Sequence, residues 1–150
     1  MLELFINNFD KIIGSFMIAV FGGYITYRIY KKTRFNDAAA TFRDCVRTEL
    51  DGFYQSKTSW GKTALPTIKE KVIKVRRYAD TFSDFLNGSS KRDFVTAKKA
   101  YCDYCESITY EMCVQLDMYP KSSPMKPEVR DSRIIFDEHV NNLLSFAKEK

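Results

Sequence analysis

The first pattern along the chain is an unbroken apolar segment. Residues 12–27 carry no formal charge, and Lys11 and Arg28 bound them on either side. As a helix these residues rise about 24 Å, slightly less than the roughly 30 Å hydrocarbon core of a bilayer, and long basic side chains at its ends reach back to the headgroups. Tyrosines follow where the aromatic belt of a membrane protein lies: Tyr24, Tyr27 and Tyr30. The pattern predicts a transmembrane helix that ends near Arg28.

The apolar segment has two other interpretations. A cleaved signal peptide needs a positively charged start and small residues at the cleavage site. Here Glu3 and Asp10 outweigh Lys11, and no such site follows. A buried core helix is the second interpretation, since short apolar segments are often core helices. The segment is apolar on all faces, which favours the membrane span over both alternatives.

The charges around the apolar segment predict its orientation. One basic residue, Lys11, precedes the segment. Four basic residues follow it closely: Arg28, Lys31, Lys32 and Arg34. The positive-inside rule places the more basic flank in the cytoplasm. The sequence therefore predicts an inner-membrane protein with its N-terminus outside, an anchor over residues 1–32 and a cytosolic domain over residues 33–150 whose cysteines stay reduced.

The rest of the chain shows helical periodicity. After the basic flank, apolar residues recur at three-to-four spacing, which is the pattern of an amphipathic helix. These residues are Phe35, Ala39, Phe42, Val46, Leu50 and Phe53. Because no strong helix breaker separates this stripe from the apolar segment, the sequence predicts one nearly continuous helix over residues 12–54.

Three further helices are predicted, each with an apolar stripe of the same period. They cover about residues 66–87, 90–119 and 129–147, and turn signals such as Asn87-Gly88 mark their ends. The two-residue alternation typical of strands is not sustained anywhere in the sequence. The predicted fold class is all-α: one N-terminal transmembrane helix followed by a cytosolic bundle of about four helices.

Small residues lie within the apolar segment: Gly14, Ser15, Gly22 and Gly23. Gly14 and Gly22 are eight residues apart and share one face of a helix, with Ala19 near it. Small faces let membrane helices approach each other closely. The pattern favours a homo-oligomer; the alternative is that glycine is simply frequent in such helices.

Composition excludes several classes of protein. Of the 150 residues, 45% are hydrophobic and 15% aromatic, so the chain is not generally disordered. A net charge of +5 falls well short of a protein that packages duplex nucleic acid, and no such partner is predicted. The single histidine excludes any mechanism that needs two. The sequence predicts no catalytic residues, no cofactor and no enzyme activity, because no nucleophile has an activating neighbour.

Basic residues are concentrated between Lys57 and Arg77. This segment holds seven basic residues and one acid, Glu70, so its net charge of +6 exceeds the +5 of the whole chain. Such a segment attracts phosphate groups, and an aromatic side chain among the cations can stack a base. The candidate ligand-binding residues are Lys57, Trp60, Lys62, Lys69, Arg76 and Arg77. Two alternatives stay open: a solvated helix face with the tryptophan anchored in the core, or contact with anionic lipid headgroups.

The cysteines offer a second candidate chemistry. Cys102 and Cys105 form a C-x-x-C pair, and Cys113 follows eight residues later. Structural zinc needs four ligands, so Cys45 and His139 would have to converge on this helix from elsewhere. Free cysteine is among the most buried residue types. The pattern favours core packing over a zinc or redox site, and no metal site is predicted.

Three short segments carry a resemblance to known proteins. They are RFNDAAATFR at residues 34–43, FVTAKKAYC at 94–102 and LLSFAK at 143–148. Together they resemble a widespread group of uncharacterised bacterial proteins with one N-terminal membrane helix and a small helical cytosolic domain. The resemblance covers most of the chain. It implies the fold and the topology, and it carries no known catalytic residues.

By layout, length and charge the chain is also similar to the small membrane-anchored effectors of type III CRISPR defence. In those proteins a cytosolic domain binds a cyclic oligoadenylate and perturbs the membrane. The similarity implies an oligomeric antiviral effector, in which an anionic nucleotide binds the Lys57–Arg77 segment and the long helix carries the change to the bilayer. The alternative function is a membrane-tethered scaffold that recruits a protein partner and binds no small ligand.

Overall fold

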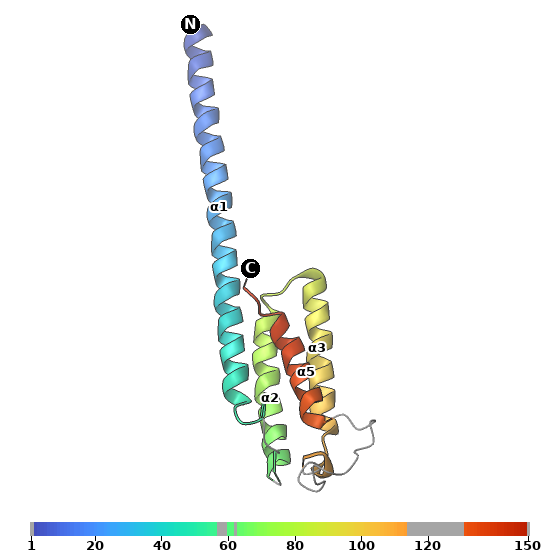
Figure 1. Ribbon diagram of the computed structural model, residues 1–150. Helices are drawn as coiled ribbons and strands as arrows, with labels where there is room; N and C mark the ends of the chain where they lie inside the picture. The colour runs from blue at the N-terminus through green and yellow to red at the C-terminus, as the bar shows by residue number, and fades with distance from the viewer. Residues whose placement is uncertain (1, 57–59, 62, 114–130, 150) are drawn as a thin grey trace.

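The computed structural model in Figure 1 describes residues 2–56, 60–61, 63–113 and 131–149, with side chains described from Met17 onward. It contains α1 (Leu2–Glu49), α2 (Ala64–Ser83), α3 (Gly88–Ser107) and α5 (Ser132–Ser145). A further helical stretch begins at residue 110 and is described as far as residue 113. All regular structure in the described residues is helical, which confirms the predicted all-α class.

Helix α1 is one continuous helix of 48 residues. Its continuity agrees with the prediction, but it begins at Leu2 rather than near residue 12 and ends at Glu49 rather than near residue 54. At 1.5 Å per residue it is about 72 Å long. Its C-terminal part, from Phe35, packs against the bundle. Its N-terminal part projects well beyond the other helices (Figure 1). Helix α1 therefore has a C-terminal part that packs in the bundle and an N-terminal part that extends beyond it.

The bundle is held together by the apolar stripes that the sequence displays. Helix α2 packs against both α1 and α3, and α3 packs in turn against α5. The stripe of α1 is buried over the bundle: Phe35, Ala39, Phe42, Val46 and Leu50. The stripe of α2 is buried with it: Ala64, Ile68, Val72, Val75, Ala79 and Phe82. Burial of these side chains is the main term that stabilises the fold.

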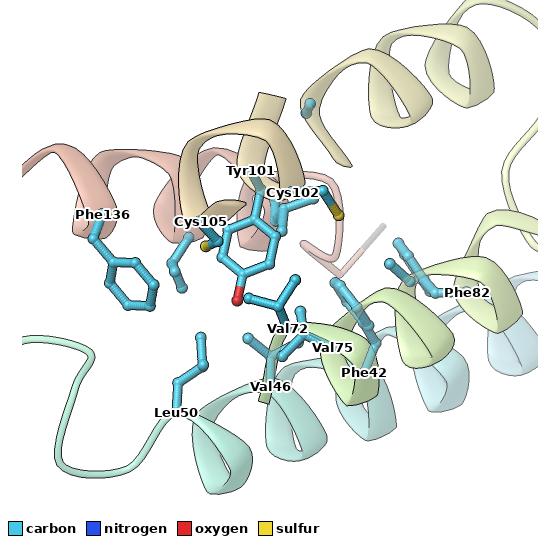
Figure 2. Close-up of a cluster of buried hydrophobic side chains, with 14 of the residues drawn as sticks. Phe42, Val46, Leu50, Val72, Val75, Phe82, Tyr101, Cys102, Cys105 and Phe136 are labelled. Atoms are coloured by element: carbon cyan, nitrogen blue, oxygen red, sulfur yellow. The ribbon is translucent and has the colours of Figure 1, made fainter. Parts of the chain in front are cut away.

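Stacked aromatic rings occupy the part of the core near the end of α2 (Figure 2). The rings of Phe42 and Phe82 are stacked with their centroids 4.8 Å apart. The ring of Phe94 meets both edge-on, at 5.8 Å from Phe42 and 5.4 Å from Phe82. Because these three residues come from α1, α2 and α3, the cluster fixes the three helices relative to one another.

The main difference from the predicted elements lies at the end of α3. The predicted helix continues to residue 119, whereas α3 ends at Ser107. Ile108 adopts an extended backbone with φ −62° and ψ 126°, and its side chain is only 2% exposed. Thr109 then precedes the next helical stretch, where a threonine suits an N-cap. Residues 114–119 of the predicted helix lie outside the described residues.

The remaining boundaries differ by a few residues. Helix α2 ends at Ser83 rather than near residue 87, and α3 begins two residues before Ser90. Helix α5 begins at Ser132 because Asp131 caps it, accepting a hydrogen bond from the backbone N–H of Arg133 at 2.9 Å. Such shifts leave the buried stripes of α1 and α2 in place.

The predicted membrane span falls on the projecting part of α1. Within the part of the chain that the structure describes, no helix combines the length and the apolar character that crossing a bilayer requires. The side chains of residues 1–16, which include the first five of the apolar segment, lie outside the described set. The next residues of α1 expose nine large apolar side chains: Met17, Ile18, Val20, Phe21, Tyr24, Ile25, Tyr27, Ile29 and Tyr30. The membrane span therefore stays a prediction, and what the structure shows is that this part of α1 exposes apolar side chains.

The predicted helix-packing face is only partly described. Gly14 and Ser15 fall among the residues whose side chains are not described. At Gly22 and Gly23 an added Cβ atom would meet nothing within 4 Å. The surface around these two glycines is therefore open in the single chain, and self-association stays a prediction.

Candidate functional site

The predicted ligand-binding residues lie on the loop before α2 and on α2 itself. Lys57 and Lys62 fall outside the described residues. The other four, Trp60, Lys69, Arg76 and Arg77, are described and do not form one site.

Trp60 is buried, with 8% of its surface exposed. Its indole ring meets Phe136 at 5.2 Å and Phe53 at 6.2 Å between centroids. The indole N–H donates a hydrogen bond of 3.3 Å to the backbone carbonyl of Phe53. The expected role of Trp60 as an exposed platform for a ligand base is therefore corrected. The structure places it as a core anchor, which is one of the alternatives that the sequence leaves open.

Two lysines of α2, Lys71 and Lys74, interact with Glu49 at the end of α1. The ammonium group of Lys71 donates to the backbone carbonyl of Glu49 and lies over the ring of Phe53. Lys74 forms ion pairs of 3.4 Å with Glu49 and with Glu70. These carboxylates raise the pKa of Lys74, with the charge of Glu49 as the largest cause. Neither lysine is free for a ligand.

The remaining cations of α2 are exposed but diverge. Lys69 and Arg76 are seven residues apart, so they share one side of α2. Burial raises the pKa of the Cys102 thiol of α3, and the charge of Arg76 opposes part of this rise. Arg77 lies about 100° further around the helix. Among the described residues none of the three has an ion-pair partner.

Three of the four cysteines lie in the core, as the core-packing interpretation predicts. Cys102, Cys105 and Cys113 are 9%, 1% and 4% exposed, and all four cysteines are free thiols. Burial raises the pKa of Cys105 to about 12 and also raises the pKa of Cys113. A protonated thiol is a poor nucleophile and a poor metal ligand. Among the described residues, no group of three or more His, Cys, Asp or Glu side chains is placed to hold a metal ion.

His139 lies on α5, where its ring stacks on that of Tyr104 with centroids 5.0 Å apart. The hydroxyl of Tyr104 donates a 2.6 Å hydrogen bond to the backbone carbonyl of Ser132 at the start of α5. Both contacts join α3 to α5. The contact between His139 and Tyr104 therefore helps to hold α5 against α3.

Tyr101 is fully buried, and its hydroxyl has no oxygen or nitrogen partner among the described residues; the thiol of Cys105, a weak hydrogen-bonding group, is its nearest polar neighbour. The hydroxyl points into the apolar cluster (Figure 2), and burial raises its pKa above the ordinary range. Such a hydroxyl destabilises a fold, because it loses its hydrogen bonds to water and gains at most a weak one to a thiol in return.

Replacing Tyr101 with phenylalanine is expected to stabilise the bundle by about 1 kcal/mol, because it removes that hydroxyl. Tyr104→Phe is the matched control: it removes the hydrogen bond to Ser132 and is expected to destabilise the bundle by about 1 kcal/mol. Urea unfolding of the full chain in detergent, followed by the fluorescence of Trp60, the only tryptophan, measures both. A Tyr101→Phe variant less stable than the control would contradict this reading of the core.

A groove lies where α1 leaves the bundle. It has a volume of about 960 Å³ and is lined by α1 between Tyr24 and Phe35 and by the end of α2 and the following turn. Its cations are Arg28, Lys31, Lys32 and Arg34, and the residues on the side of α2 are Asp84, Phe85 and Asn87. The sequence assigns these cations to orientation and the tyrosines to an aromatic belt. The sequence alone does not indicate that the residues after α2 form a groove with these cations, because the groove depends on how α1 and α2 pack.

Comparison with known proteins finds no family model, no curated protein and no solved structure that matches the chain. The resemblance to single-pass bacterial proteins and the similarity to membrane-anchored effectors stay predictions.

Proposed function

We propose that the protein is a membrane-tethered helical bundle: the N-terminal part of α1 is a single-pass anchor, and the bundle is a platform that recruits a protein partner at the cytoplasmic face. The observation that supports this most strongly is the projecting part of α1. It exposes nine large apolar side chains between Met17 and Tyr30, and no other described element covers them. A contiguous apolar surface of this kind marks a membrane or protein contact in soluble and membrane proteins alike.

Continuity of α1 gives the tether a mechanical role. The residues at the base of the projection, from Phe35, are locked into the bundle by packing against Phe82. Because α1 has no break, it fixes both the distance of the bundle from the bilayer and the orientation of the bundle relative to the bilayer. Tyr110, 43% exposed near the far end of α3, is a candidate contact for the recruited partner.

The predicted orientation, with the bundle in the cytoplasm, rests on the basic residues between Arg28 and Arg34. A protease-cleavable tag after Lys150 tests it in sealed vesicles. We expect cleavage in inside-out vesicles and protection in right-side-out vesicles. Protection in the inside-out vesicles and cleavage in the right-side-out ones would contradict the proposed orientation.

A second candidate function is the nucleotide-gated effector. It is favoured by one observation: Lys69, Arg76 and Arg77 are exposed cations without an ion-pair partner among the described residues. The burial of Trp60 removes the stacking contact that this function was expected to use. The scaffold therefore ranks first, because it needs no convergent cation site.

Titration of cyclic oligoadenylates against the full chain in detergent separates the two functions. The effector predicts micromolar binding that is lost in Arg76→Glu and kept in Lys99→Glu, an exposed charge reversal on α3. No binding by any cyclic oligoadenylate at micromolar concentration would exclude the effector and leave the scaffold.

A further inference from the structure

The groove at the base of the projection continues the packing seam of α1. Counting back from Phe35, residues at helical spacing on the same face are Lys31, Arg28 and Tyr24. On the C-terminal side of Phe35, this face of α1 is apolar and buried in the bundle. On the N-terminal side of Phe35, the same face carries cations and lines the groove beside the end of α2. The seam therefore changes from a packing surface to a basic groove at the point where the bundle ends.

Positive charge dominates this groove. Four cations of α1 line it, against one carboxylate, that of Asp84. Asp84 is paired at 3.4 Å with Lys91, outside the lining. Among the described residues none of the four cations has an ion-pair partner. Unpaired cations beside one another repel, so the groove favours an anion.

Aromatic rings hold two of the guanidinium groups in place. Arg28 lies over the ring of Tyr24 at 5.6 Å, and Arg34 lies between the rings of Tyr30, at 5.7 Å, and Phe85, at 5.6 Å. A guanidinium stacked on rings keeps its N–H groups free at the edge, where they fit the oxygens of a phosphate. Phe85 is the contribution of the bundle, because it lies in the turn that follows α2.

We propose that this groove binds the phosphate headgroup of an anionic phospholipid. The inference rests on the proposed membrane anchor, which places the groove at headgroup depth: its lining begins at Tyr24, so the exposed apolar residues from Met17 to Phe21 lie beyond one end of it and the bundle lies at the other end (Figure 1). Tyrosines at this level are typical of the interface. The lipid would bridge α1 and the end of α2, and so fix the bundle against the bilayer surface.

The test uses the full chain purified from vesicles of phosphatidylcholine with a minority of phosphatidylglycerol. The retained lipids are quantified by mass spectrometry. We expect phosphatidylglycerol to be enriched about fivefold over its bulk fraction. Lys31→Gln with Arg34→Gln should bring the ratio close to the bulk value. The matched control, Arg92→Gln with Lys99→Gln, removes the same charge from exposed positions on α3 and should leave the enrichment unchanged.

Four results would overturn the inference, the first three without touching the membrane anchor. The first is a chain that stays in the vesicles without enrichment, which leaves the anchor standing and removes only the headgroup site. The second is an equal loss of enrichment in both double variants, which indicates general attraction to the whole protein. The third is saturable binding of inorganic phosphate to the detergent-solubilised chain, lost in Lys31→Gln with Arg34→Gln, which assigns the groove to a soluble anion. A chain that does not enter the vesicles at all overturns the anchor and this inference together.

Discussion

Replacing Val20 with aspartate is expected to release the chain from membranes. Val20 lies near the middle of the apolar segment and is 52% exposed on the projecting part of α1. A charged residue at the centre of a membrane helix costs about 3 kcal/mol relative to valine, which corresponds to more than a hundredfold in the insertion equilibrium. The measurement is the fraction of the full chain that sediments with membranes after expression.

The matched control for this substitution is Ile73→Asp. Ile73 is also an exposed apolar residue, 62% exposed, but it lies on α2 within the bundle. The same change in chemistry there should leave the chain with the membranes. If the two variants sediment alike, the projecting part of α1 is not what holds the chain to the bilayer.

Phe82→Ala is expected to destabilise the bundle by about 4 kcal/mol. The Phe82 side chain is 2% exposed and stacks on Phe42, with Phe35 and Phe94 against its other edges. Its removal loses the transfer free energy of the ring and leaves a cavity between helices that cannot close without moving α1. A domain of this size is stable by only about 5–15 kcal/mol, so much of its stability would be lost.

The loss is measured by urea unfolding of the full chain in detergent, with Trp60 fluorescence as the signal, since this side chain is buried in the folded bundle. Val95→Ala on α3 is the control: Val95 is 42% exposed, and its truncation should change the free energy of unfolding by less than about 0.5 kcal/mol. A Phe82→Ala variant as stable as the control would mean that the helices do not meet at this cluster.

The helices could be predicted because each buries a stripe with the period of the α-helix. The same rule explains the error at the end of α3. Ile108 falls on the predicted stripe and is buried, so its side chain fits the pattern. Only its backbone differs, with the extended ψ of 126° that ends the helix. Periodicity reports which side chains are buried, and it says little about a local change in backbone conformation.

The ligand site was harder to predict than the fold, because it depends on where side chains far apart in the sequence meet. Charged neighbours favour an exposed Trp60, yet Phe136 on α5 supplies the surface that buries it. The net charge between Lys57 and Arg77 is a property of the sequence. Whether those cations converge depends on the partners of α2, and Glu49 engages two of them. The groove beside Arg34 could not be predicted for the same reason, since Phe85 completes it from the turn after α2.

The most direct test of the proposed tether is extraction of the unmodified full chain from membranes with alkaline carbonate, which strips proteins held only at the surface. A helix that crosses the bilayer keeps the chain in the membrane pellet and releases it only with detergent. Recovery of the chain in the carbonate supernatant would show that α1 is not embedded in lipid, and would contradict the proposed membrane tether.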